Sequence, residues 1–211
     1  MNKRPDFSIL SPIYDFLGIL AFQGTLHRSQ LFLLNELKQS QNALIIGGGT
    51  GRFFVDLMKS GKVDKVTYVD ISPGMIKKAE SKIKKLASSD RVSFICGGLD
   101  SIPEEKFDLI CTHYFLDCFP EDQLPEVMAK LNHFLSDNGD WHFTDFYLNE
   151  SSSFIQRKTV GFLYWFFRLS CGIKVRKLAN FENQFEDVGL SEFKNKFFRR
   201  RLIKTAIYRK A

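Results

Sequence analysis

The residues best suited to chemistry form a glycine run between an apolar segment and a helical pattern. Residues 43–56 read ALIIGGGTGRFFVD, which places glycine at Gly47, Gly48, Gly49 and Gly51. Glycine tolerates positive φ and lets a ligand approach the backbone closely. The first turn of a helix adds free N–H groups and the positive end of the helix dipole. The run therefore predicts a binding loop.

A carboxylate follows the glycine run at the end of the next apolar segment. Asp70 comes directly after Lys65–Val69, where it could accept hydrogen bonds from both hydroxyls of a ribose. Alternatively, it could cap the helix expected to begin near Pro73, although Ser72 is better placed for that role. We favour the ribose interpretation.

The glycine spacing distinguishes between three classes of ligand. No Gly-Lys-Ser/Thr follows the run, which disfavours a Walker A phosphate loop. Arg52 and Phe54 occupy the positions where a dinucleotide fingerprint needs its last glycine, so a nicotinamide-linked oxidoreductase is the weaker alternative. A G-x-G-x-G loop suits a nucleoside that carries a short charged tail.

Apolar runs alternate with helical patterns along the chain, which predicts an α/β fold with helices on both faces of a mostly parallel sheet. We expect seven strands, two of them in a closing hairpin over Glu192–Phe198 and Leu202–Tyr208. The other five are expected at Ala43–Ile46, Lys65–Val69, Val92–Cys96, Phe107–Cys111 and Trp141–Phe146. Helices are expected over Ser8–Phe22, Leu26–Leu37, Arg52–Met58, Met75–Leu86, Pro120–Leu135, Phe154–Cys171 and Leu178–Val188, with a turn at Ser136–Gly139.

The 211 residues fit one domain. We expect N-terminal helices in 1–40, a ligand-binding core in 41–150, an insertion in 151–176, and a closing helix and hairpin in 177–211.

Several motifs together resemble the class I methyltransferases that use S-adenosylmethionine, especially small-molecule enzymes of the ubiquinone/menaquinone-biosynthesis type. The motifs are the glycine run, Asp70, Ser72-Pro73-Gly74-Met75, Gly97-Gly98-Leu99 and Phe107-Asp108-Leu109-Ile110. The resemblance implies a Rossmann-like fold with S-adenosylmethionine as cofactor. It also implies that the glycines line the methionine and ribose, that Asp70 holds the ribose, and that Ile71, Met75 and the Leu99 backbone surround the adenine.

Two departures from the family pattern concern acidic residues. Many relatives carry an acid in the first strand, where this chain has Leu44-Ile45-Ile46, and another at the position of Gly98. Asp100 could replace the second acid. These departures leave open a protein that binds the cofactor without catalysis.

On the acceptor side, the resemblance places Thr112 and His113 near the sulfonium. His113 is the candidate general base, or alternatively a side chain that shapes the pocket, and Asp117 could orient it or cap the next helix. His142 and Cys111 are expected to be structural, and the histidines show no metal-ligand spacing, so no metal is expected.

The resemblance also implies that the N-terminal helices and the insertion cover the acceptor. Aromatic residues of the insertion either pack as core or form a lid over an apolar or aromatic acceptor. They are Phe154, Phe162, Tyr164, Trp165, Phe166 and Phe167. Nearby basic residues could attract an anionic group of that acceptor.

Composition and charge set the remaining expectations. Hydrophobic residues make up 44% and charged residues 26%, as in folded domains, and no leader pattern or cysteine pairing is visible, so we expect a cytoplasmic protein. The net charge is +6, with basic residues concentrated after Arg157. That region could face RNA or a membrane surface, or be solvated. RNA methylation is the alternative, which the absence of an Asn/Asp-Pro-Pro-Tyr tetrapeptide disfavours. The prediction is methyl transfer to a small molecule.

Overall fold

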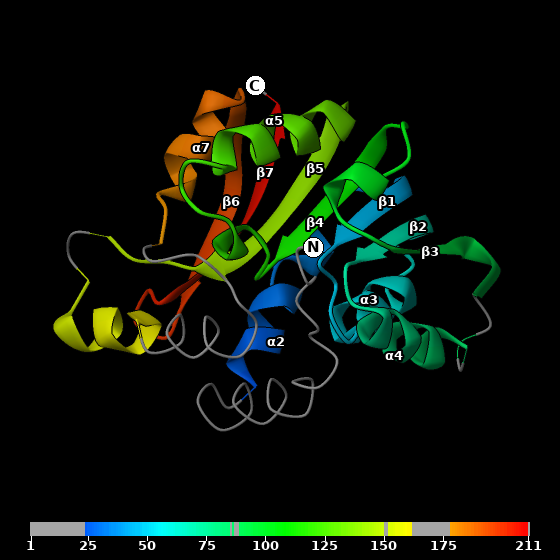
Figure 1. Cartoon of the computed structure of the whole chain (residues 1–211), viewed down its shortest axis with the longest axis horizontal. Helices are drawn as coiled ribbons and strands as arrows, with labels where there is room; N and C mark the ends of the chain where they lie inside the picture. Colours follow the sequence, from blue (N-terminus) through cyan, green and yellow to red (C-terminus); the bar gives the residue numbers. More distant parts are fainter. Residues whose placement is uncertain (1–23, 85, 87–88, 150–151, 162–177, 211) are drawn as a thin grey trace, which may run out of the picture.

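A computed structural model of the chain describes residues 24–210 except 85, 87–88, 150–151 and 162–177 (Figure 1). Seven strands form one sheet in the order β3-β2-β1-β4-β5-β7-β6, which confirms the predicted fold class. The strands are β1 (Ser40–Ile46), β2 (Val63–Asp70), β3 (Val92–Cys96), β4 (Phe107–His113), β5 (Leu135–Phe146), β6 (Leu190–Phe198) and β7 (Ile203–Lys210).

The first five strands are parallel, and β7 joins β5 and β6 in the antiparallel sense. β1 pairs with β2 on one side and with β4 on the other, so the strand order reverses at β1. Ligands of open α/β sheets bind at such a reversal, beyond the carboxyl ends of the strands. The glycine run follows β1, and Asp70 is the last residue of β2. Both therefore lie at this edge of the sheet.

The helices cover both faces of the sheet (Figure 1). Helices α5 (Leu124–Phe134) and α7 (Phe181–Asp187) cover one face. Helices α2 (Thr25–Leu31), α3 (Arg52–Lys59) and α4 (Pro73–Ile83) cover the other. Each face has its own apolar cluster. The cluster beneath α5 and α7 includes Trp141 and Phe143, and the cluster on the other face includes Tyr68 of β2 and Phe54 of α3. Short 3-10 turns complete the chain at Leu34–Glu36, Ser89–Arg91, Leu99–Ser101 and Leu116–Cys118.

Several predicted boundaries are wrong. The helix expected over Leu26–Leu37 stops at Leu31 and is followed by a separate 3-10 turn. The helix expected from Pro120 begins at Leu124, because Gln123 N–H closes a turn on the Pro120 carbonyl. The helix expected over Leu178–Val188 is shorter and corresponds to α7. Asn180 caps α7 by accepting a hydrogen bond from Glu182 N–H.

The turn expected at Ser136–Gly139 lies inside β5, which runs unbroken from Leu135. Phe107 pairs with Leu135 but Leu109 pairs with Asp140, so the extra residues are absorbed as a bulge between two ladder positions. The prediction of a turn that precedes a strand beginning at Trp141 is therefore wrong, because the strand already begins at Leu135.

Two predicted elements fall wholly or partly outside the described residues. The helix expected over Ser8–Phe22 lies outside them, as does the expected insertion from residue 162 onward, with Phe162, Tyr164, Trp165, Phe166 and Phe167. Residues 154–161 are helical, and Phe154 and Ile155 are exposed there. In the part of the chain that the structure covers, no helix is both long and apolar enough to cross a membrane.

Candidate functional site

The glycine run forms a tight loop between β1 and α3. Gly47, Gly49 and Gly51 have φ values of 64°, 60° and 75°, which other residues adopt with strain. A Cβ on Gly47 would lie 2.4 Å from the Phe115 ring, and one on Gly48 would lie 2.4 Å from the Tyr68 ring. A Cβ on Gly49 would meet nothing within 4 Å, so the loop is open at that residue.

The end of β2 fastens this loop through two side chains. Tyr68 donates its hydroxyl proton to the Gly49 carbonyl at 2.9 Å, and Asp70 Oδ2 accepts the Gly49 N–H at 2.9 Å. Asp70 Oδ1 accepts from Ser72 N–H at 2.9 Å. The carboxylate therefore faces the loop. Burial raises the pKa of Asp70, and these two backbone hydrogen bonds oppose that shift.

Other predicted cofactor contacts surround this edge of the sheet. Ile71 is 39% exposed directly after Asp70, whereas Met75 is buried in the first turn of α4. Ser72 caps α4 by accepting from Met75 N–H, the role that the sequence assigned to it. Leu99 opens the 3-10 turn after β3 and packs on the core. Asp100 is exposed and forms an ion pair with Lys130.

Thr112 and His113 end β4, but their side chains face opposite sides of the sheet. Thr112 Oγ1 accepts from Trp141 Nε1–H at 2.8 Å and is fully buried. The Thr112 side chain therefore belongs to the core beneath α7. The His113 ring lies edge-on to Phe53 of α3, with 4.3 Å between ring centroids.

A cluster of potential metal ligands surrounds His113. Cys111 and His113 lie two positions apart on β4, so their side chains share one face of the sheet. Cys111 lies opposite His142 on β5. The thiol and one nitrogen from each imidazole lie within 4.8 Å of one another. Thiolate and imidazole are ligands that zinc accepts. The sequence reading missed this grouping because it depends on the register of two strands.

The histidines belong to a buried chain of hydrogen bonds. His113 Nε2 lies 3.2 Å from His142 Nδ1, and His142 Nε2 lies 3.3 Å from Thr205 Oγ1. Thr205 Oγ1 also lies 2.8 Å from Thr144 Oγ1, and the imidazole tautomers set which atom donates in each contact of the histidines. Burial lowers the pKa of His142 to about 3 and that of His113 well below 6.5. Both rings are neutral at pH 7.

A carboxyl pair lies at the carboxyl ends of β4 and β5. Asp117 and Asp145 are both buried, and each carboxyl lies close enough to the other to influence its pKa. Asp145 also accepts from Asp117 N–H at 3.2 Å and from Phe146 N–H at 2.9 Å. Asp117 thus contacts Asp145, whereas the sequence analysis offered it as a residue that orients His113 or caps the next helix. Asp145 was not singled out, although an acid ending a predicted parallel strand was a usable signal.

Burial perturbs the ionisation of this pair. It raises the pKa of Asp117 to about 6, and burial together with the neighbouring Asp117 charge raises that of Asp145 well above its ordinary value. Two adjacent carboxyls in a dry site cannot both ionise easily.

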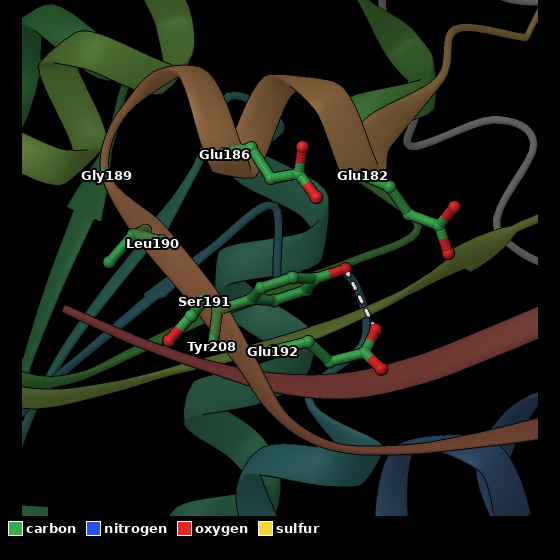
Figure 2. A pocket seen from close by; sticks show the side chains of 7 residues that line it. All are labelled: Glu182, Glu186, Gly189, Leu190, Ser191, Glu192 and Tyr208. Carbon is green, nitrogen blue, oxygen red and sulfur yellow. Dashed lines mark hydrogen bonds between the residues drawn. The ribbon is translucent and has the colours of Figure 1, made fainter. Parts of the chain in front are cut away.

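A separate hollow of about 430 Å³ lies between α7 and the β6–β7 hairpin (Figure 2). Glu182, Glu186 and Glu192 line it with Tyr208, which donates to Glu192 at 3.4 Å. β6 lies four strands from β1 in the sheet, so this hollow is distant from the glycine loop. The buried Lys204 forms ion pairs with Glu182 and Glu192.

Comparison with known proteins identifies a methyltransferase domain model over residues 43–139. A malonyl-[acyl-carrier protein] O-methyltransferase of Priestia megaterium is 34% identical over 113 residues, which are 53% of this chain and 39% of that protein. The chain thus matches about two fifths of the length of this curated relative. Residues 43–139, which the domain model matches, include the glycine loop, Asp70 and the end of β4.

Solved structures share the fold over nearly the whole chain. The DhpI–SAH complex has a TM-score of 0.70 at 19% identity, covering 97% of this chain and 93% of that one. The mitomycin 7-O-methyltransferase MmcR has a TM-score of 0.71 at 14% identity, covering 98% and 61%. Residues 43–139 thus match a methyltransferase domain, and the chain shares the fold of these solved structures.

Proposed function

We propose that this chain transfers a methyl group from S-adenosylmethionine to a small-molecule acceptor. The observation that carries the proposal is Asp70, whose carboxylate faces the glycine loop at the reversal of strand order. A buried carboxylate beside open backbone suits a ribose diol, because hydrogen bonds to an ionised acceptor are strong.

The remaining cofactor contacts follow from position. Gly47, Gly48, Gly49 and Gly51 would line the methionine and ribose, with the open side of Gly49 nearest the ligand. Ile71 and Met75 would pack beside the adenine, and the Leu99 backbone would meet its edge. Because the Thr112 side chain is bonded to Trp141, Thr112 would contribute through its backbone.

When bound, the cofactor supplies an activated methyl group on a sulfonium. The chain's own task is then to align the acceptor and exclude water, and alignment can supply roughly 7–11 kcal/mol of a reaction barrier. Phe115 and Tyr114 follow β4 at the end of the loop nearest the acceptor side and would form part of that alignment surface.

His113 as general base stays a prediction. Its Nε2 atom is engaged with His142 Nδ1, so a tautomer with the proton on Nε2 would leave Nδ1 as the atom able to take a proton. Burial holds its pKa well below 6.5, so it would be a weak base. An acceptor that is already ionised, such as a carboxylate, would need no base at all.

We propose an apolar or aromatic acceptor with an anionic group. The name of the Priestia megaterium relative supports this class, because a malonyl group carries a free carboxylate. The O-methyltransferase names of that relative and of MmcR favour oxygen as the methylated atom. A labelled-cofactor screen of carboxylic acids and phenols would test the acceptor class.

Calorimetric titration with S-adenosylmethionine and S-adenosylhomocysteine tests the cofactor site. Asp70→Asn should weaken both ligands about tenfold or more, since it removes a charge-assisted bond. Asp64→Asn, an exposed change on the same strand, should leave both affinities unchanged. Failure of the native chain to bind either ligand at millimolar concentration would refute the proposal.

A further inference from the structure

Cys111, His113 and His142 form a polar cluster within the sheet face that α3 covers. The three side chains come from neighbouring strands, with Cys111 and His113 on β4 and His142 opposite Cys111 on β5. All three are buried, and Cys111 and His142 are almost completely so. The proposed cofactor site uses neither Cys111 nor His142. Burying polar groups costs free energy unless they are paired or bind a metal ion, so the cluster is a candidate for a second site.

The spacing of the ligand atoms fits a four-coordinate ion. The Cys111 sulfur and one nitrogen of each imidazole all lie within 4.8 Å of one another. His113 Nε2 and His142 Nδ1 are 3.2 Å apart. In a tetrahedral zinc site with Zn–N bonds of about 2.0–2.1 Å, two nitrogen ligands are separated by about 3.4 Å. One ion between the rings could therefore replace their mutual hydrogen bond with little movement of either imidazole.

Neighbouring side chains hold the two rings in this arrangement. His142 Nε2 lies 3.3 Å from Thr205 Oγ1, so a metal ion on Nδ1 leaves the other ring nitrogen to donate to that hydroxyl. The Phe53 ring lies edge-on to His113, with 4.3 Å between ring centroids, and its centroid is 5.6 Å from that of His142. Metal-binding histidines usually donate their second ring N–H in this way, which fixes the tautomer and the ring orientation.

The protonation states are compatible with a metal ion. Burial lowers the pKa of both imidazoles, so protons do not compete for their nitrogens at pH 7. Burial raises the pKa of the Cys111 thiol, so metal binding would release its proton to solvent as the sulfur–metal bond forms. The proton between the two rings would stay on the histidines, on a ring nitrogen that does not bind the ion.

We propose that Cys111, His113 and His142 bind one zinc ion, which joins β4 to β5 inside the sheet. Thiolate and imidazole are ligands that zinc prefers, whereas magnesium and calcium take oxygen ligands. Three protein ligands leave the fourth position to a water molecule or a small thiol. The inference goes beyond methyl transfer and does not depend on the proposed cofactor site.

Zinc binding to the untagged, chelator-treated chain is the first test. Competition with a chromogenic zinc chelator should give one zinc ion per chain. Cys111→Ser and His142→Gln should each weaken zinc binding about a hundredfold or more, because each removes one of three ligands. Cys96→Ser and His133→Gln, changes at an exposed cysteine and an exposed histidine, should leave the affinity unchanged. Equal zinc affinity in the native chain and in Cys111→Ser would overturn the inference.

Cobalt(II) in place of zinc reports the ligands of the native chain, so it tests the inference even if a ligand variant fails to fold. The cobalt-loaded chain should show a thiolate-to-cobalt charge-transfer band and the intense visible bands of a four-coordinate ion. Addition of zinc should remove both. A native chain that binds no zinc, or that binds cobalt without the thiolate band, would overturn the inference. Because S-adenosylmethionine binding is measured separately, either failure would leave the proposed function intact.

Discussion

Two buried titratable pairs lie along β4 and β5 and just beyond the end of β4, and burial shifts the pKa of the two pairs in opposite directions. His113 and His142 lie on the side of α3, where Phe53 covers both rings. Asp145 lies on the side of Phe143 and α7, and meets Asp117 beyond the end of β4. Both pairs are shielded from water, and burial lowers the pKa of each histidine and raises the pKa of each aspartate.

The difference follows from what each side chain becomes when it is neutral. A neutral imidazole has one donor and one acceptor, so His113, His142 and Thr205 satisfy one another in a chain. A neutral carboxyl has a donor and an acceptor as well, but an ionised carboxylate beside a second acid in a dry site is unfavourable. Burial therefore favours the neutral form in both pairs, by lowering the pKa of the histidines and raising that of the acids.

The largest expected effect concerns acid sensitivity on the histidine side. Folding lowers the pKa of His142 from about 6.5 to about 3, so its contribution is complete above pH 6.5 and is lost as pH falls toward 3. Between pH 7 and pH 4.5 the native chain should lose about 3 kcal/mol of its free energy of unfolding because of His142. The His142→Gln variant should not show this part of the loss. Urea unfolding at both pH values measures this. An unchanged pH dependence would mean that the histidine pair is not shielded.

The acidic pair should respond with the opposite sign. Folding raises the pKa of Asp117 to about 6, so its contribution is present at low pH and is lost as pH rises through 6. Asp117→Asn removes the repulsion and gives Asp145 an amide donor, so unfolding at pH 8 should require about 2 kcal/mol more than in the native chain. Thermal or urea unfolding measures this difference. A variant that is less stable than the native chain at pH 8 would contradict the raised pKa of Asp117.

The smallest expected effect is a loss of stability when Thr205, the residue that hydrogen-bonds His142, is substituted. Thr205→Val removes the hydroxyl that hydrogen-bonds His142 Nε2 and Thr144 Oγ1, and it should cost about 1 kcal/mol at pH 7 because buried polar atoms lose their partner. Thr205→Ser retains the hydroxyl and is the matched control. Equal losses for valine and serine would show that packing, and not the hydrogen bond, matters at this position.

Features carried by short segments were predictable from the sequence. The glycine loop, the Ser72 cap and Asp70 at the end of β2 all occur where their residue types indicate, since loop conformation and capping depend on neighbours only a few positions away. The closing β6–β7 hairpin followed from two adjacent apolar patterns. The Ser136–Gly139 bulge did not, because a bulge and a turn use the same residue types.

Features that join distant segments required the folded chain. Cys111 meets His142, and Asp117 meets Asp145, across about thirty residues of sequence and through the register of parallel strands. Nothing local fixes that register, because it is set by the packing of whole strands against helices on both faces. By itself the sequence thus determined the fold and the cofactor loop, whereas only the tertiary structure decided which buried side chains face one another and, through burial, which of them keep a charge.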